Sequence, residues 1–273
     1  MQKKYYIFII ITMIHFRGSA QFAFPPLNPQ SSGMGNLSVV LKDSRAATDN
    51  IAALPLSNKS AVAIGLSQYY MLSEMSYKNI AFSIPISKIN ALGMHYTHFG
   101  SSVYNEQRLA LQYAQLLGKN ISLGVELDYL HCGTSDIYYD KYHRITFSTG
   151  LQIYLSKDLT LGFYTFNPFG VSLNKTYNQK IPTIVKLGMG YNITPQLLAA
   201  IEFEKNIFMK HCINTGLEYK AFKFLDIRIG FSSHPIMYSV GVGFKHNSWA
   251  IDFSTQVHNH LGVSPNIAVA YLF

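Results

Sequence analysis

The chain has 273 residues, of which 13% are charged and 14% aromatic, and its formal net charge is +8. Soluble proteins carry about 25% charged residues, so this composition argues against an ordinary soluble domain. The basic residues are scattered rather than gathered in a stripe, which excludes the usual pattern of nucleic-acid binding. No internal run reaches the roughly 18 apolar residues of a membrane helix. Low charge, many aromatic residues and no helical span are typical of a membrane β-barrel.

The first 20 residues predict a secretory signal peptide. Lys3 and Lys4 precede an apolar run at 5–16, and small residues at 18–20 offer a cleavage site before Gln21. The alternative is an uncleaved membrane anchor, but the apolar run is short for one.

Residues 21–59 alternate poorly between apolar and polar, and we expect them to plug the lumen or the periplasmic mouth of a barrel. The sequence predicts an extended Pro-rich stretch at 22–29, a turn at 31–36, a short strand at 37–41 and a short helix at 44–50. The residues singled out in this plug are Gly33, Gly35, Asn36, Asp43, Asp49 and Asn50.

Residues 60–273 predict an all-β antiparallel barrel of about fourteen transmembrane strands, because period-two alternation recurs along this whole region. Each strand is near the length that a tilted membrane strand needs. The expected strands are 60–70, 75–86, 89–99, 106–116, 119–131, 142–155, 158–166, 182–192, 196–204, 210–220, 225–233, 236–246, 248–257 and 265–273.

Every second connection between these strands is a tight polar turn, whereas several of the others are longer. Outer-membrane barrels have short periplasmic turns and longer outer loops. An even strand number places both chain ends on the periplasmic side. The longer connections are expected at 100–105, 132–141, 167–181 and 258–264. A soluble β-sandwich, the alternative fold, would also alternate, but its loops need not alternate in length.

The strand parity that faces inward has few large residues and carries several charges. A hydrated lumen with compensating charges explains them, as would a selective pore lining, and no solute can be chosen from the sequence. The expected lumen-lining residues are Glu126, Asp128, Lys186, Glu202, Glu204, Glu218, Arg228 and Asp252.

The last strand alternates large apolar residues, among them Tyr271 and Phe273, with Ala268 and Ala270. It resembles the carboxyl-terminal signal that the barrel-assembly machinery reads in outer-membrane barrels. We therefore expect that machinery and the outer-membrane lipid of a Gram-negative bacterium as partners. Protein partners in a larger outer-membrane complex are also expected.

The stretch 33–40, followed by Asp43 and by 49–54, resembles the entry segment of FadL-like barrels. It is most similar to the branch that contains PorV and PorQ of the type IX secretion system, although Ile51 stands where that branch has Pro. The resemblance implies a non-enzymatic accessory subunit of an outer-membrane secretion or assembly machine. The alternative that it implies is a FadL-like channel for uptake of hydrophobic small molecules.

Histidines gather near the predicted outer rim, and two of them stand beside the two cysteines of the chain. Imidazole and thiolate suit zinc or copper, but histidine is also at home at a membrane interface, and the spacing is not that of a tight metal motif. No cofactor is expected. The candidate metal ligands are His258, His260, His131, Cys132, His211 and Cys212.

A disulfide between Cys132 and Cys212 is disfavoured, because five strands separate them and a disulfide needs Cα atoms within about 7 Å. Catalysis also has little support. Ser135, Asp140 and His143 are candidates by residue type alone, and no nucleophile-elbow motif is present.

Overall fold

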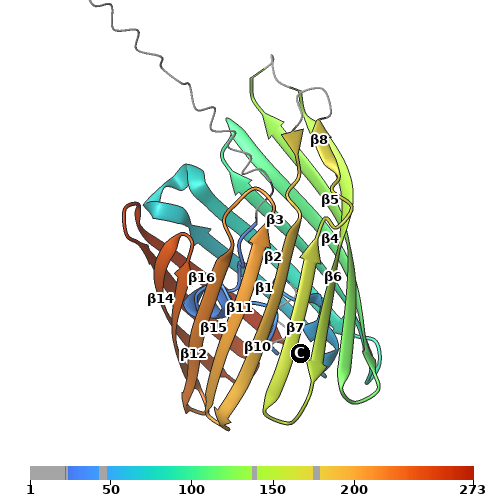
Figure 1. Ribbon diagram of the computed structural model, residues 1–273, viewed down its shortest axis with the longest axis vertical. Coiled ribbons are helices and arrows are strands. Elements are labelled where there is room, and N and C mark those ends of the chain that lie inside the picture. The colour runs from blue at the N-terminus through green and yellow to red at the C-terminus, as the bar shows by residue number, and fades with distance from the viewer. Residues whose placement is uncertain (1–21, 23, 43–47, 137–139, 175–178) are drawn as a thin grey trace, which may run out of the picture.

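The computed structural model describes residues 22, 24–42, 48–136, 140–174 and 179–273, and within these residues fourteen antiparallel strands close into a barrel (Figure 1). The wall follows chain order through β7, continues from β10 and closes where β16 pairs with β1. Its strands are β1 (Ala61–Gln68), β2 (Ser76–Pro85), β3 (Asn90–Gly100), β4 (Tyr104–Leu117), β5 (Ile121–Thr134), β6 (Tyr142–Tyr154), β7 (Leu159–Phe166), β10 (Ile184–Thr194), β11 (Leu197–Asn206), β12 (Cys212–Phe222), β13 (Leu225–Ser233), β14 (Ile236–His246), β15 (Trp249–His258) and β16 (Gly262–Leu272).

The expected antiparallel barrel of about fourteen strands is therefore confirmed, with two local differences. The first strand ends at Gln68, because Tyr69–Met71 and Ser73–Met75 form single 3-10 turns, η3 and η4, with Tyr70 at a positive φ. The long connection after β7 also contains a small hairpin of its own, formed by β8 (Ser172–Asn174) and β9 (Gln179–Lys180).

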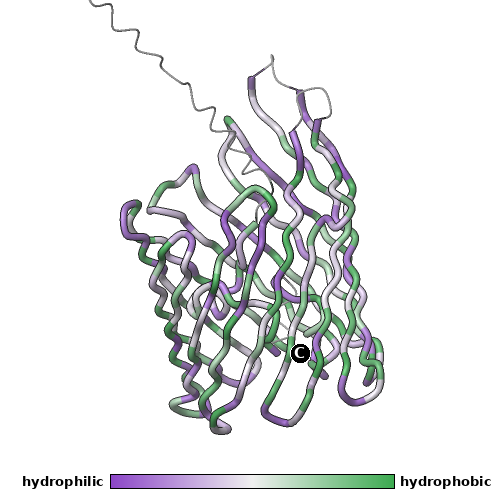
Figure 2. Tube along the Cα trace, viewed as in Figure 1, coloured by the Kyte–Doolittle hydropathy of each residue, from purple (hydrophilic) through white to green (hydrophobic). Residues whose placement is uncertain are grey.

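Alternating side chains give the wall two different faces. On β5, Val125 and Leu127 are about half exposed on the outside, while Glu126 and Asp128 are buried on the inside. The same alternation of hydrophobic and hydrophilic residues is visible along most strands in Figure 2. A closed wall with apolar side chains outside and polar ones inside is the arrangement of an outer-membrane barrel.

Among the described residues, no helix is long and apolar enough to cross a membrane.

The two ends of the barrel differ in their connections. At one end the strands are joined by tight turns of two to four residues: 86–89, 118–120, 155–158, 195–196, 223–224 and 247–248. At the other end the connections are 69–75, 101–103, 135–141, 167–183, 207–211, 234–235 and 259–261. Since outer-membrane barrels have their short turns in the periplasm, we call the first the inner end and the second the outer end. Phe273 lies at the inner end, hydrogen-bonded to Ser60.

The segment before β1, described at residues 22, 24–42 and 48–59, is called the plug, and most of these residues lie inside the barrel. Its helices are α1 (Pro29–Gly33), capped by the Asn28 side chain, and the 3-10 helix η2 (Ile51–Leu56), capped by Asn50. Its apolar residues, with those of the inner wall, form the main buried cluster. Fold prediction was weakest here: the expected turn at 31–36 begins as helix, and 37–41 forms no strand. The helix expected at 44–50, with Asp43, falls largely outside the described residues.

The last strand has the two faces expected of it. Tyr271 and Phe273 are 40% and 59% exposed on the outside, whereas Ala270 packs inward with Ala63 and Ala250. Backbone bonds between Ser60 and Phe273 extend the β1–β16 seam to the end of the chain. The role of this strand as an assembly signal stays a prediction.

Candidate functional site

A cavity of about 510 Å³, which we call the outer vestibule, opens between the outer rim of the wall and the plug. Phe24, Pro25 and Pro26 of the plug form part of its lining, and strands from both sides of the barrel complete it. Its aromatic and sulfur-containing wall residues are Tyr69, Tyr70, Met75, Tyr77, Phe99, Tyr104, Met209, Cys212 and Met237. Clefts of 300–1,000 Å³ that are mostly apolar, with a few polar groups, are typical of small-molecule sites.

Aromatic contacts hold one side of the vestibule. The rings of Tyr77 and Phe99, which face each other across β2 and β3, have centroids 4.4 Å apart. Tyr77 also meets the ring of Tyr69 at 5.5 Å and that of Phe24 at 6.0 Å. These distances lie within or at the short edge of the range of about 4.5–7 Å at which aromatic pairs attract. The plug and the wall therefore share one aromatic surface, which a small apolar molecule could contact.

A second cavity of about 210 Å³, the inner chamber, lies between the plug and the inner ends of β7, β10, β11, β12 and β14. Its lining differs in kind from that of the vestibule, since most of its side chains are polar. They include Gln30, Lys42, Asn192, Gln196, Glu218, Lys220 and Lys245. The vestibule and the inner chamber have no lining residue in common.

Wall carboxylates bind backbone amides and one side chain of the plug. Glu202 on β11 accepts hydrogen bonds from the amides of Ser38 and Val39, at 2.8 and 2.9 Å. Glu106 on β4 accepts one from the Phe22 amide at 2.7 Å, and Glu218 accepts one from the Gln30 side chain at 2.8 Å. Hydrogen bonds to a charged group contribute about 1.5–3 kcal/mol each. The plug is thus tied to at least three points around the wall.

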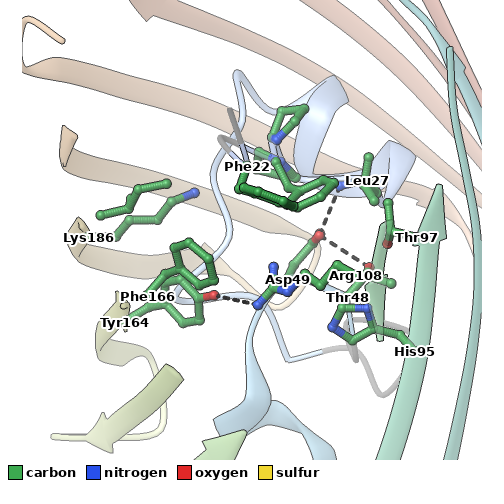
Figure 3. A pocket seen from close by; sticks show the side chains of 14 residues that line it. Phe22, Leu27, Thr48, Asp49, His95, Thr97, Arg108, Tyr164, Phe166 and Lys186 are labelled. Carbon is green, nitrogen blue, oxygen red and sulfur yellow. Dashed lines mark hydrogen bonds between the residues drawn. The ribbon is translucent and has the colours of Figure 1, made fainter. Parts of the chain in front are cut away.

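Asp49 is the corresponding carboxylate within the plug (Figure 3). It accepts hydrogen bonds from the Leu27 amide, at 3.1 Å, and from the Ser31 hydroxyl, so it joins both ends of the plug. Burial raises the pKa of the Asp49 carboxyl above its ordinary value, and these hydrogen bonds oppose the rise. Asp49 lines a space of only about 30 Å³ between plug and wall, which leaves room for little more than a water molecule.

Glycines on the inner face of the wall make room for the plug. A Cβ atom on Gly230 would lie 2.1 Å from the backbone nitrogen of Gly35, and one on Gly162 would lie 2.2 Å from the Val39 carbonyl oxygen. Both distances are far below any van der Waals contact. Gly35 itself has a φ of +75° and lies against Phe231, so a residue with a side chain is strained there.

Three groups of opposite charges line the lumen at the level of the plug. In the first, Arg108 pairs with Glu126 and Asp128, and its guanidinium also reaches the Tyr164 hydroxyl at 3.3 Å. His95 lies 3.3 Å from Glu126. All of these side chains are buried. Buried charges are stable only when paired and hydrogen-bonded, and here the Nε and Nη2 atoms of Arg108 each have a carboxylate partner.

The other two groups lie across the lumen. Lys186 lies 3.6 Å from Glu202 and 3.3 Å from Glu204. Arg228 is 1% exposed and contacts three carboxylates, those of Glu218 at 2.7 Å, Asp252 at 2.6 Å and Asp226 at 3.4 Å. Both groups are linked to the plug, one through Glu202 and the other through Glu218.

The eight residues expected to line the lumen all project from the inner face of the wall and take part in these groups. Arg108, Asp226 and His95 belong to the same groups, and Glu106 binds the plug; the sequence reading missed all four. Arg108 and Glu106 share the inward parity of β4 with Ala110 and Gln112, so the same alternation could have found them.

The plug residues named from sequence have unequal roles. Gly33 packs against Gly241, and Asn50 caps η2. The Asn36 side chain accepts a hydrogen bond from Gln256 at 2.7 Å. Asp43 lies outside the described residues.

The candidate metal ligands are not brought together. His131 lies on the outer face of β5 and Cys132 on the inner face, because neighbouring residues of a strand point to opposite sides. His211 is exposed and Cys212 is turned inward. The Nδ1 atom of His258 accepts the His260 amide at 3.1 Å. Among the described residues, no three His, Cys, Asp or Glu side chains are placed to hold a metal ion.

The two cysteines are both free thiols. Cys132 lies 3.5 Å from the Tyr104 hydroxyl, and Cys212 lies 3.1 Å from the Asn214 side chain, on a strand well separated along the wall.

No protein-family model and no curated relative matches this sequence. Solved structures do match in fold. The CymD monoaromatic hydrocarbon channel superposes with a TM-score of 0.68 at 12% identity, over 92% of this chain and 97% of that one. A Pseudomonas aeruginosa FadL homologue superposes with a TM-score of 0.66 at 12% identity, over 92% of this chain and 98% of that one. The P. putida toluene transporter TodX superposes with a TM-score of 0.66 at 11% identity, over 91% of this chain and 98% of that one.

At such low identity the likeness shows a shared fold. The chain has the architecture of the FadL-like barrels of the Gram-negative outer membrane, as its resemblance implied. These likenesses carry no information on a PorV/PorQ-like branch or on type IX secretion.

Proposed function

We propose that the protein is a non-enzymatic outer-membrane channel that takes up hydrophobic small molecules. This was the alternative in the sequence reading, and it now has more support than the secretion-subunit hypothesis. The observation that carries it is the outer vestibule, because its apolar, aromatic lining opens at the outer end and its floor is the plug. Burial of apolar surface, at about 25 cal/mol per Å², would draw such a molecule from water.

The route beyond the vestibule is closed by the plug. A molecule in the vestibule would meet Phe24, Pro25 and Pro26 first, and passage requires that some of the plug contacts change. Wall carboxylates make several of the hydrogen bonds that hold the plug, and neutral wall side chains such as Gln152 and Ser122 make others. Passage therefore requires several of these contacts to change together.

The test is uptake of radiolabelled toluene, a neutral monoaromatic hydrocarbon, by Gram-negative cells with and without the protein in their outer membrane, with glucose as the polar comparison. The wild type should speed toluene entry and leave glucose entry unchanged. Met237→Glu places a charge inside the vestibule, where Met237 is buried. This variant should lose the faster toluene entry. Ser101→Glu adds the same charge in the exposed connection after β3 and should not. Equal uptake by both variants, or no acceleration by the wild type, would reject the proposal.

A second candidate is a docking subunit in a larger outer-membrane complex. It is favoured by large apolar side chains exposed on the outer connections: Met71, Leu72, Val103, Ile207, Phe208, Met209 and Leu261. Purification in a mild detergent would show a stoichiometric partner if this is the main role. That partner should be lost on Met71→Ser/Phe208→Ser, whereas toluene uptake should survive. A protein that stays monomeric in the membrane extract counts against this candidate.

A further inference from the structure

A row of basic and polar side chains crosses the outside of the barrel on five neighbouring strands. Cross-strand register places its members directly beside one another. Since neighbouring strands lie about 4.8 Å apart, the row is about 19 Å long. We call it the basic row; it consists of Lys78 on β2, His98 on β3, Gln107 on β4, His131 on β5 and His143 on β6.

On each of its five strands the basic row follows an apolar or aromatic residue of the outer face. The next outward residue toward the inner end of each strand is apolar or aromatic, and these five residues are again in register. They are Ile80, Tyr96, Leu109, Tyr129 and Ile145. Beyond the row, toward the outer end, stand Asn105 and the exposed Lys141. Side chains at such a boundary meet the headgroups of the outer leaflet.

The wall on the other side of the barrel has a different edge. There Tyr238, Val257 and Val263 are the outward residues in register near the outer ends of β14, β15 and β16, and all three are exposed and largely apolar. The concentration of imidazole and ammonium groups on β2–β6 is therefore not repeated on this part of β14–β16, although Lys205 and His211 stand near the outer ends of β11 and β12.

The groups of the basic row are available to an anion. In the part of the chain that the structure describes, no ion pair engages any of its members. His131 and His143 face each other with their Nδ1 atoms 3.2 Å apart, and the Tyr129 hydroxyl lies 2.6 Å from His143 Nδ1. These contacts use one nitrogen of each ring, and the other is left to bind a ligand.

We propose that the basic row binds the phosphorylated headgroup of an outer-leaflet glycolipid. Phosphate groups accept hydrogen bonds from ammonium and imidazole groups, and basic side chains at a membrane surface attract anionic headgroups. The site is on the outside of the wall, so it is separate from the proposed uptake route.

The slope of the row favours a glycolipid over a phospholipid. Residues in register lie perpendicular to the strands, and strands of such barrels tilt by about 40°, so the row climbs by roughly 12 Å along the membrane normal. The headgroup layer of an ordinary bilayer is only about 6 Å deep on each side. A phosphorylated sugar headgroup extends farther from the hydrocarbon and can contact both ends of the row.

The test is native mass spectrometry of the detergent-purified protein with diphosphoryl lipid A, dephosphorylated lipid A and inorganic phosphate. The wild type should retain diphosphoryl lipid A and neither of the other probes. Lys78→Gln/His98→Gln/His131→Gln/His143→Gln should lower retention by at least about fivefold, the effect of roughly one charge at a membrane surface. Lys205→Gln/His211→Gln is the matched control, because both residues are exposed near the outer ends of β11 and β12, and it should retain the lipid.

Correct folding of each variant is checked by its heat-modifiable migration in SDS gels. Equal retention of diphosphoryl lipid A by the folded quadruple variant and the wild type would overturn the proposal. Equal retention of the dephosphorylated lipid by the wild type would do so too, because the apolar belt alone would then explain binding. Retention of inorganic phosphate alone would show a general anion site rather than a lipid site.

Discussion

The outer vestibule and the layer of plug and charges beneath it are built on opposite principles. The vestibule is lined mainly by aromatic and sulfur-containing side chains, although Glu106 and Glu204 also line it. The layer below buries carboxylates, arginines and a lysine at almost zero exposure. Both lie inside one barrel, and both include residues from the plug and the wall.

This contrast explains how the barrel can attract apolar molecules and remain closed. The vestibule offers apolar contact that does not depend on direction, so molecules of many shapes can enter it. The layer below depends on geometry, since each buried charge needs its partners in place. The strength of the closure should therefore respond sharply to single polar substitutions, and affinity for ligand should respond weakly to single apolar ones.

The largest effect is expected from Arg228→Met. This change removes the cation that Glu218, Asp226 and Asp252 share and leaves three buried carboxylates without it. Removal of one member of a buried ionic group costs about 3–5 kcal/mol. Urea unfolding in detergent should show that loss of unfolding free energy. Lys223→Met, in an exposed turn at the inner end, is the control, and equal stability of the two variants would contradict a structural role for the group.

The next effect is expected from Glu202→Gln, which should loosen the plug and leave the wall intact. The neutral amide weakens the bonds to the Ser38 and Val39 amides and the pairing with Lys186. A charged hydrogen bond contributes about 1.5–3 kcal/mol. Single-channel recordings in planar bilayers should then show more frequent ion-conducting openings than in the wild type.

Glu204→Gln is the matched control for that recording. Glu204 pairs with the same Lys186 at 3.3 Å, but among the described hydrogen bonds none joins it to the plug. If both variants open equally often, the lost negative charge on β11 causes the openings, and the lost hydrogen bonds to the plug do not.

The wall could be predicted from sequence, and the interior largely could not. Strand number and the inward direction of residues such as Glu126 and Asp252 follow from a period of two, which depends only on backbone geometry. The pairing of Arg228 with three carboxylates depends on barrel register, which no local pattern specifies. The plug has no periodicity, and its conformation is set by contacts such as those of Glu202 with Ser38.

The inward glycines carried a signal that the sequence reading did not use. Gly162 and Gly230 stand on the inward faces of β7 and β13, and each lies against the plug backbone. A glycine on the inner parity of several strands indicates that another backbone passes close by. The vestibule could not be anticipated, because its lining comes from 3-10 turns and strand ends on opposite sides of the barrel.

A smaller effect is expected when the aromatic pair of the vestibule is removed. Tyr77→Ala/Phe99→Ala deletes two rings 4.4 Å apart, and aromatic pairs contribute about 0.5–1.5 kcal/mol beyond their burial. Titration calorimetry in detergent should show an affinity for toluene weaker by up to about tenfold. Phe222→Ala/Phe224→Ala removes a stacked pair at the inner end and should leave the affinity unchanged. A loss of the same size in both variants would mean that the toluene site is not the vestibule.

The smallest effect is expected from Lys245→Gln at the edge of the inner chamber. Lys245 contacts Asp226 at 2.9 Å, yet its side chain is 43% exposed. Exposed ion pairs contribute about 0–1 kcal/mol, because water screens the charges and holding a long side chain costs entropy. The free energy of unfolding in urea should therefore change by less than about 1 kcal/mol, although Asp226 belongs to the group that Arg228 stabilises. A loss as large as that of Arg228→Met would mean that Asp226 depends on the lysine rather than on the arginine. The exposed Lys245–Asp226 pair, and not the buried charges around Arg228, would then stabilise the closed lumen.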